Sequence, residues 1–231
     1  MCAPATLNEG RELPTIGSSD HDYGNWDRRS PVPFVSLVYY QMATAQKLTS
    51  TINGVDVNGL FATIDAVKAT PSIAKFKFRI NNQWKGASQN RSTVNQFYGA
   101  GQEQSRPKAF LLEADEPAIL LGKDAAANPV EHLLHALASC ITTSMVYHAA
   151  ARGIQIKEVE SSFEGDIDLH GFLNLDNKVR KGYEGIRVNF KIKADVPDEQ
   201  LTEVLKLGTT FSPVFDSLTN GVPVSVSAER L

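Results

Sequence analysis

The chain has 231 residues, 42% hydrophobic and 21% charged, an ordinary globular composition that is long enough for one large domain or two small ones. Its net charge of -3 argues against a general nucleic-acid binder, and no stretch approaches the ~20 apolar residues of a membrane span, so neither nucleic acid nor a membrane is an expected partner. Two cysteines cannot form a disulfide framework, so the expected location is cytoplasmic.

Residues 1–41 differ in composition from the rest of the chain. They are rich in Gly, Pro, Ser and Asp and have no hydrophobic periodicity, which predicts a flexible N-terminal extension outside the fold. The alternative is a short docked arm with apolar anchors at Phe34, Val35, Leu37 and Tyr39. The chain from Met42 onward looks like a natural protein start.

Residues 42–74 are predicted to be an N-terminal helical segment, and residues 75–231 the main domain. Apolar side chains recur at helical spacing before a proline, at Val57, Leu60, Ile64 and Val67. The main domain begins with a predicted half-buried strand, because Phe76, Phe78 and Ile80 alternate with cationic residues. The stretches RSTVNQFYG and PKAFLLEAD are further strand candidates.

Residues 127–153, ANPVEHLLHALASCITTSMVYHAAARG, are predicted to form one long helix. Asn128 can cap its start, Pro129 suits its first turn, and Glu131 can complete a capping box. Gly153 suits the left-handed position that ends a helix. The stretch is apolar almost all round, so this helix is expected to be central and buried.

Two alternating stretches follow, IKEVESSFEGDIDLHG and YEGIRVNFKIKADV, and predict an antiparallel strand pair joined by FLNLDNKVRKG. PDEQLTEVLKLG predicts a helix, SPVFDSLTNG a short helix capped by Ser212, and VPVSVSAER a closing strand. Strands and helices come in blocks and do not alternate, which predicts an α+β fold.

Cys140 lies in the middle of the long helix, whereas the other cysteine, Cys2, is at the N-terminus. At helical spacing it shares a stripe with Ala136, Leu137, Ser144 and Tyr147. A free cysteine on so apolar a helix is usually a small, inert hydrophobic residue. The pattern alone therefore favours a structural role.

Two motifs at a characteristic separation favour a different role. NPVEHLLHALASC is followed roughly seventy residues later by SPVFDSL in a short capped helix. The stretches QWKGASQNRSTVNQF and DEPAILLGKDAAANPVEHLL precede them. Together these stretches resemble the OsmC/Ohr family, the osmotically inducible and organic-hydroperoxide-resistance proteins, over roughly Lys75 to the C-terminus.

The resemblance implies an OsmC-like fold, in which antiparallel sheets wrap around long central helices in an intertwined homodimer. It implies that Cys140 is the peroxidatic thiol at the dimer interface, with organic hydroperoxides as substrates and an external thiol or dithiol as reductant. In the family an arginine and a glutamate hold this thiol as the thiolate. Arg91 is the best match to the arginine, with Arg79 and Arg106 in reserve, and no cofactor is expected.

This chemistry needs the thiolate. A free thiol with a pKa near ~8.5 is only a few per cent ionised at neutral pH. A guanidinium that lowers a thiol pKa by ~2 units supplies about 2.7 kcal/mol and makes the thiolate dominant. The thiolate then attacks the peroxide oxygen and becomes a sulfenic acid.

The sequence departs from the family pattern in three respects. The part through about Ala74 has no counterpart in the short family members, so the resemblance is closer to a longer OsmC-like subgroup that lacks the resolving cysteine. The other two departures are at the site. Val130 stands where a glutamate normally follows the Asn-Pro pair. Glu131, next to it, is the candidate carboxylate, although it also suits the helix cap, and Asp115 or Glu116 could substitute unless each is a solvated loop charge. Ser212 replaces the resolving cysteine and cannot form a disulfide, so a one-cysteine cycle remains open.

The long helix also carries histidines at His132 and His135. Their spacing is three residues, and the glutamate precedes the first histidine, unlike the zinc-protease motif, so no metal site is expected.

Two functions therefore stay open. The first is a thiol-dependent peroxidase that reduces organic hydroperoxides in oxidative stress defence. The second is a non-enzymatic OsmC-like dimer that binds a fatty or aromatic small molecule. Val130 and Ser212 favour the binding protein, whereas Cys140 and Arg91 favour the enzyme.

Overall fold

The computed structural model describes residues 51–230. The predicted extension over residues 1–41, its alternative docked arm and Cys2 lie outside the described residues, so these expectations stay predictions.

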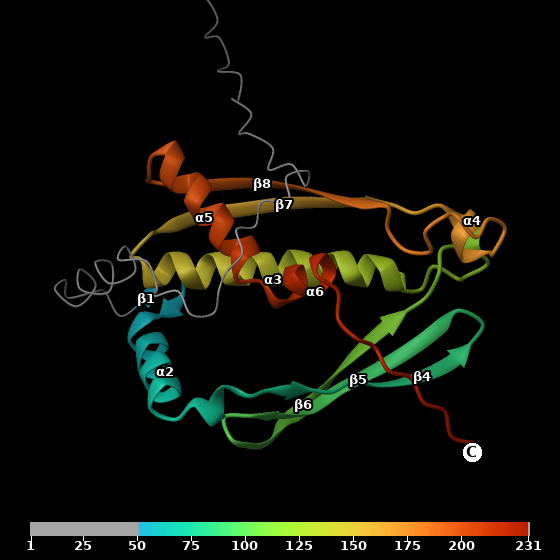
Figure 1. The fold of residues 1–231 in the computed structure, drawn as a ribbon, viewed down its shortest axis with the longest axis horizontal. Helices are drawn as coiled ribbons and strands as arrows, with labels where there is room; N and C mark the ends of the chain where they lie inside the picture. Colours follow the sequence, from blue (N-terminus) through green and yellow to red (C-terminus); the bar gives the residue numbers. More distant parts are fainter. Residues whose placement is uncertain (1–50, 231) are drawn as a thin grey trace, which may run out of the picture. The chain divides into compact units, whose positions relative to one another are not determined.

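Helices and antiparallel strands come in blocks along the described chain, which confirms the predicted α+β class (Figure 1). The strands are β1 (Thr51–Ile52), β2 (Val55–Asp56), β3 (Lys77–Phe78), β4 (Asn81–Gly86), β5 (Gln89–Gly99), β6 (Gln102–Ala114), β7 (Ile156–Asp166) and β8 (Gly185–Ala194). The helices are α2 (Val57–Ala69), α3 (Pro129–Ala151), α4 (Leu169–Phe172), α5 (Asp198–Thr210) and α6 (Pro213–Thr219), with short turns of 3-10 helix at η1 (Pro71–Ala74) and η2 (Ala118–Leu120).

A tight hairpin precedes α2 and was not predicted. β1 and β2 pair across Asn53 and Gly54, whose φ angles of 54° and 77° are left-handed, as this dipeptide readily allows. The Asn53 side chain donates to the Ile154 carbonyl at 2.9 Å and accepts from the Ile156 amide at 2.7 Å. These bonds fix the hairpin to the chain just after α3.

Strands β3 to β6 form one sheet, in which β5 pairs with β6 along one edge and with β3 and β4 along the other. The register and the ring contacts place large apolar side chains on one face, which we call the aromatic face: Phe76, Phe78, Trp84, Phe110 and Leu112.

The predicted half burial of the first strand is wrong within one chain. Phe78 is 72% exposed, and Phe76 and Ile80 are exposed as well. The alternation does encode a strand with one apolar face, but the described residues do not cover that face.

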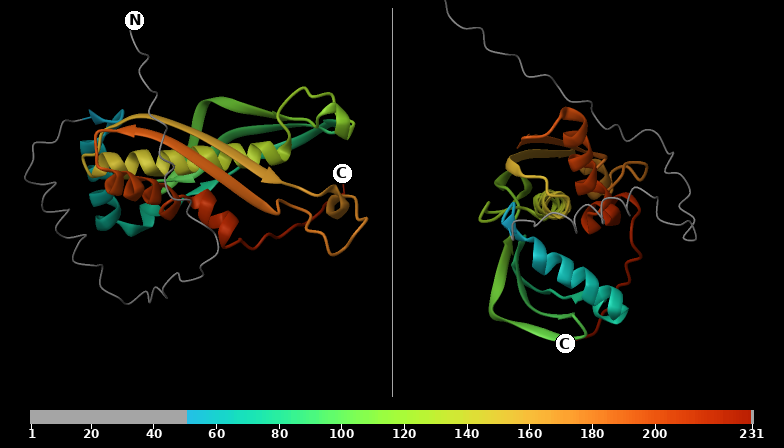
Figure 2. Two further views of the ribbon diagram at one scale, coloured as in Figure 1. Left: turned by 90° about the horizontal axis from the view of Figure 1, so that it is seen from above. Right: turned by 90° about the vertical axis from the view of Figure 1, so that its left-hand side faces the viewer.

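Strands β7 and β8 form the predicted antiparallel pair, with Asp166 opposite Gly185 at one end and Ile156 opposite Ala194 at the other. Figures 1 and 2 show this pair running along α3. The segment between them contains α4, an element that the sequence analysis did not predict.

The main core lies where α3 meets α5 and the β7–β8 pair. Met145 and Ala149 of α3 pack there with Val204 of α5, and Gly208 lets the α5 backbone approach α3 closely. The expectation that α3 is central and buried is confirmed for the side that carries Met145 and Ala149, whereas other parts of the helix surface are exposed within one chain. Tyr147, for example, is 48% exposed.

The closing strand predicted from VPVSVSAER is also absent from the described residues. Residues 221–230 pair with no strand within residues 51–230, and Val222, Val224 and Val226 are exposed. The alternation predicts a strand, but a strand exists only where a second edge supplies hydrogen bonds.

Candidate active site

Helix α3 positions Cys140, and its local sequence explains where the helix starts. The Asn128 side chain accepts from the Glu131 amide at 2.8 Å, and the Glu131 carboxylate accepts from the Asn128 amide at 2.8 Å. This is the predicted capping box. Cys140 is half-buried on α3 and is a free thiol.

The junction between α5 and α6 is tied to α3 close to Cys140. Ser144, one turn after Cys140, donates its hydroxyl to the Phe211 carbonyl at 3.2 Å. His148, a further turn on, stacks its ring on Phe211 with centroids 4.0 Å apart. Burial, and then the nearby Arg152, lowers the pKa of His148, so the neutral ring is favoured.

Ser212 follows Phe211 directly and is almost completely buried. Its hydroxyl accepts from the Phe215 amide at 3.1 Å and caps α6, which confirms the predicted cap. The two motifs that carry the resemblance therefore lie close together. Phe211, which precedes Ser212, is hydrogen-bonded to Ser144 of α3, one turn from Cys140.

Arg91 lies on β5, and its guanidinium is paired with a carboxylate that the sequence analysis did not consider. Arg91 Nε donates to Glu113 Oε1 at 2.7 Å across the β5–β6 ladder. Both side chains are about half exposed. Within residues 51–230, no hydrogen bond or ion pair joins Arg91 to Cys140.

The two reserve arginines are also held within their own sheet. Arg79 forms a bidentate pair with Glu103 at 2.7 and 2.8 Å, which lowers the pKa of that carboxyl. Arg106 donates to the Asn95 carbonyl at 2.7 Å and lies over the ring of Phe97.

Asp115 is not the solvated loop charge that the sequence allowed, because it is buried at 1% exposure. Its carboxylate accepts from the Ser88 hydroxyl at 2.6 Å and from three backbone amides at 2.9 to 3.2 Å, those of Glu116, Lys123 and Ala125. The Ser88 bond, supported by these amides, lowers the pKa of Asp115 to about 2. Asp115 therefore organises the loop before α3.

Two histidines of α3, His132 and His148, make ordinary structural contacts. His132 bonds through Nε2 to the Glu113 carbonyl at 2.8 Å. Within the described part of the chain, no three His, Cys, Asp or Glu side chains are grouped as metal ligands. No helix among residues 51–230 has both the length and the apolar character needed to cross a bilayer.

The geometry defines a class of protein: an α+β domain with a free thiol on a central helix, beside a capped helix that follows in sequence. Residues 122–227 match the family model described as OsmC-like protein. These residues are therefore an OsmC-like domain, which confirms the family resemblance there. For residues 75–121 the resemblance stays a prediction.

Solved structures of OsmC-like proteins are similar to this chain at low sequence identity. One is an OsmC-like protein from Mycoplasma pneumoniae, with 17% identity, a TM-score of 0.47, and 62% of this chain and 86% of that chain covered. Another, from Legionella pneumophila, is described as an organic hydroperoxide resistance protein OsmC and predicted redox protein, with 13% identity, a TM-score of 0.44, and 62% and 91% covered. A sequence comparison with curated proteins found no match.

Proposed function

We propose that this protein is a thiol-dependent peroxidase that reduces organic hydroperoxides at Cys140. The observation that carries the proposal is the position of Cys140 on α3, one turn from the bonded α5–α6 junction, within a segment that matches the OsmC-like family model. A thiol in this position can receive an oxygen atom while one side of the helix stays packed in the core.

The cycle uses one cysteine of the chain. The Cys140 thiolate attacks the outer oxygen of ROOH, the O–O bond breaks, and the products are Cys140 sulfenic acid and the alkoxide RO⁻, which takes a proton from water to give the alcohol ROH. An external thiol then attacks the sulfenic sulfur, which releases water and leaves a mixed disulfide. A second thiol, or the other arm of a dithiol, reduces this disulfide. Ser212 has no part in these steps because a hydroxyl cannot form a disulfide.

Arg91 is proposed to hold the thiolate, with Glu113 orienting the guanidinium. The ion pair with Glu113 uses only Nε of Arg91. The two terminal nitrogens are therefore left to donate to a sulfur. Glu113, from β6, would then take the role of the family's glutamate, which together with the arginine holds the thiolate. Glu131 is not proposed for this role because its carboxylate is engaged in the helix cap.

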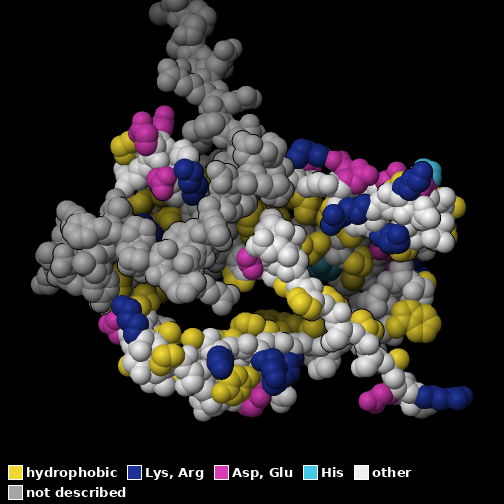
Figure 3. Space-filling model, viewed as in Figure 1, with side chains coloured by type: hydrophobic (Ala, Val, Ile, Leu, Met, Phe, Trp, Pro, Cys, Tyr) yellow, Lys and Arg dark blue, Asp and Glu magenta, His cyan; other side chains and the backbone are white. Residues whose placement is uncertain are grey.

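The sulfur that Arg91 reaches is proposed to be that of a second copy in a homodimer. A second copy is supported by the aromatic face, because Phe78 and Trp84 are 72% and 69% exposed, more than is usual for apolar side chains left in water. Arg91 and Glu113 lie on the opposite face of the sheet, since Glu113 alternates with Leu112, so the aromatic face argues for a partner and not for the direction of Arg91. Figure 3 shows hydrophobic side chains gathered over the strands of this sheet. Covering each such side chain contributes about 1.5–3 kcal/mol.

The test is consumption of cumene hydroperoxide with an excess of dithiol, compared between the wild type and Cys140→Ser. We expect the variant to fall to the rate measured without protein. Cys2→Ser is the matched control and is expected to keep the wild-type rate. Equal rates for the wild type and Cys140→Ser would end the proposal.

A binding protein without catalysis is the second candidate. It is favoured by the hydrogen bonds that each of the three candidate arginines donates within its own sheet, Arg79 and Arg91 to carboxylates and Arg106 to a backbone carbonyl. An apolar ligand that binds while Cys140 stays reduced in the presence of hydroperoxide would support it.

A further inference from the structure

The end of strand β6 carries Glu113, the carboxylate that is proposed to orient Arg91, and this end is hydrogen-bonded to helix α3. The Nε2 atom of His132 lies 2.8 Å from the Glu113 carbonyl oxygen. A carbonyl oxygen can only accept a hydrogen bond, so Nε2 of His132 carries a hydrogen and donates it. His132 is at the start of α3, the helix that also carries Cys140. The bond therefore joins this helix to the backbone of the Arg91–Glu113 pair.

The place of this pair in the sheet makes such a bond important. Arg91 and Glu113 lie directly opposite each other, one step from the end of the β5–β6 ladder at Asn90 and Ala114. Within residues 51–230, β6 has a strand neighbour on one side only. Both side chains are about half exposed, and an exposed ion pair holds its partners only weakly. The position of the guanidinium therefore depends on how firmly the backbone of β6 is held at this point.

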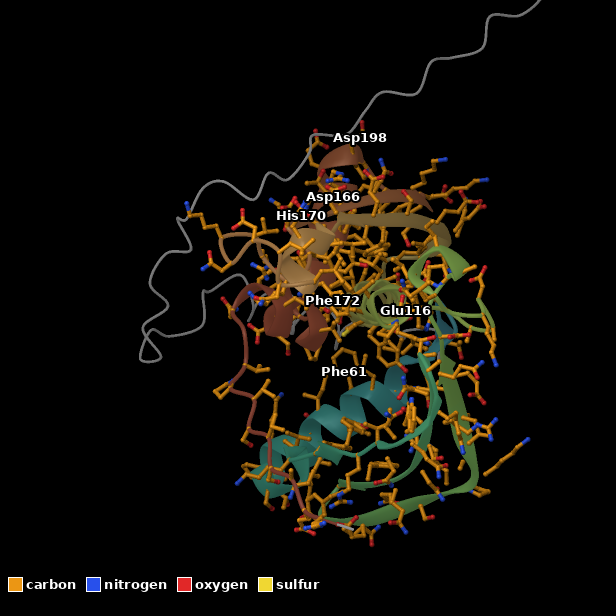
Figure 4. All side chains as sticks on the ribbon, turned by 90° about the vertical axis from the view of Figure 1, so that its right-hand side faces the viewer. Phe61, Glu116, Asp166, His170, Phe172 and Asp198 are labelled. Carbon is orange, nitrogen blue, oxygen red and sulfur yellow. The ribbon has the colours of Figure 1, made fainter. Side chains whose placement is uncertain are left out.

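Two bonds hold the backbone of β6 near its end. Asp115, two residues after Glu113, is buried and accepts from the hydroxyl of Ser88, which joins β6 to the turn before β5. The His132 bond joins Glu113 itself to α3. Figure 1 shows β6 running toward the end where α3 begins, and Figure 4 looks onto this end, with Glu116 labelled beside the helix.

We propose that His132 is a positioning residue for the thiolate of Cys140, because its hydrogen bond sets where Glu113 presents Arg91. This inference rests on the proposed function and deepens it: Arg91 contacts the sulfur, and His132 acts only through Arg91. His132 transfers no proton in this role, since the neutral ring with its hydrogen on Nε2 and the protonated ring both donate the bond.

The test is the rate at which iodoacetamide alkylates Cys140, measured as a function of pH in a Cys2→Ser background, where Cys140 is the remaining thiol. The thiolate is the reactive form, so the midpoint of this profile reports how well the anion is stabilised. His132→Leu, which removes the donor, should move the midpoint up by about one pH unit and make alkylation about tenfold slower below the midpoint.

His132→Gln should rescue the midpoint, because the side-chain amide of this variant can donate to the Glu113 carbonyl. Both replacements have at least the helix propensity of histidine, so α3 is expected to form in each variant. A midpoint in His132→Gln as high as that in His132→Leu would contradict the role of the donor.

The matched control is Tyr183→Phe, which removes a different hydrogen bond at the start of α3. The Tyr183 hydroxyl donates to the Val130 carbonyl at 2.9 Å, and Tyr183 lies just before β8 and not on β6. This variant should leave the midpoint unchanged. A shift equal to that of His132→Leu would mean that any loosening at this end weakens the thiolate, and the proposal would be overturned.

Arg91→Ala separates this inference from the proposed function. It should move the midpoint up by about two pH units, and the addition of His132→Leu should move it no further. Additive shifts would show that His132 does not act through Arg91. If Arg91→Ala raised the midpoint and His132→Leu did not, this inference alone would be wrong. If Arg91→Ala left the midpoint unchanged, the role proposed for Arg91 would be wrong, and this inference with it.

Discussion

Glu113 is the residue of the candidate site that the sequence analysis missed. It lies opposite Arg91 only because of the β5–β6 register, which shifts at a bulge between Val94 and Gln96. No local pattern specifies that bulge, so the partner of Arg91 could not be read from the sequence. The roles of Glu131 and Ser212 as helix caps could be predicted, because a cap depends on residues only three positions apart.

Asp115 is expected to make stability depend on pH in the acid range. Its pKa in the folded protein, about 2, lies below the ordinary 3.8 because Ser88 and backbone amides favour the charged form. The stabilisation is therefore complete above the ordinary value and is lost as the pH falls through the folded value. The melting temperature of the wild type should therefore decrease as the pH is lowered from about 3.8 to about 2.

Asp115→Asn should melt at a lower temperature than the wild type at neutral pH. The NH₂ group of the asparagine side chain is a donor, and it would face groups that are themselves donors, either Ser88 or the backbone amides of Lys123 and Ala125. Its melting temperature should change less over the same acid range. The control Asp124→Asn, in the same loop, should follow the wild type. If the melting temperatures of Asp115→Asn and of the wild type decreased by the same amount over this pH range, this role of Asp115 would be contradicted.

At the scale of elements, α3, α5, α6 and the β7–β8 pair were predictable because their periodicity, caps and alternation are local signals. The short helix α4 was not, because its four residues have no periodicity of their own and are held by tertiary contacts such as that of Gly171 with Arg180. The strand predicted at the C-terminus is not formed among the described residues, although its alternating pattern is clear. A strand also needs a neighbouring edge for its hydrogen bonds, and residues 51–230 do not supply one.

Gly208→Ala should destabilise the contact between α5 and α3. A Cβ there would lie 2.9 Å from Ile141 Cγ2 and 3.0 Å from the Ile141 carbonyl oxygen. Overpacking of this kind costs about 1–3 kcal/mol, and alanine regains only ~1 kcal/mol through its higher helix propensity. Urea unfolding should therefore show a net loss of stability.

Thr210→Ala is the control, because it is an exposed substitution to alanine in the same helix. It should leave the free energy of unfolding within about 0.5 kcal/mol of the wild type. A Gly208→Ala variant as stable as this control would mean that α5 does not approach α3 this closely.

At the scale of the whole molecule, the proposed homodimer would account for three features of residues 51–230: the aromatic face, the exposed part of α3 and the C-terminal residues that have no strand partner within this range. Each is an apolar surface or edge that a second copy could cover. The sequence suggested a dimer only through the family resemblance, since residue patterns indicate that a face is apolar but do not identify what covers it.

The proposed dimer predicts that one complete site takes Cys140 from one copy and Arg91 from the other. Arg91→Ala and Cys140→Ser should each be nearly inactive with cumene hydroperoxide. Co-expressed in equal amounts, they should recover about a quarter of the wild-type activity, because half of the dimers are mixed and each mixed dimer has one complete site. If the arginine served its own copy, the mixture would stay inactive.

The most direct test of the account is a single turnover without any reductant. Reduced protein is mixed with one equivalent of cumene hydroperoxide in the presence of dimedone, which traps sulfenic acids, and peptides and alcohol are quantified by mass spectrometry. We expect one equivalent of alcohol and a dimedone adduct on Cys140. Unconsumed hydroperoxide together with an unmodified Cys140 thiol would contradict the claim that the peroxide oxygen is transferred to this sulfur.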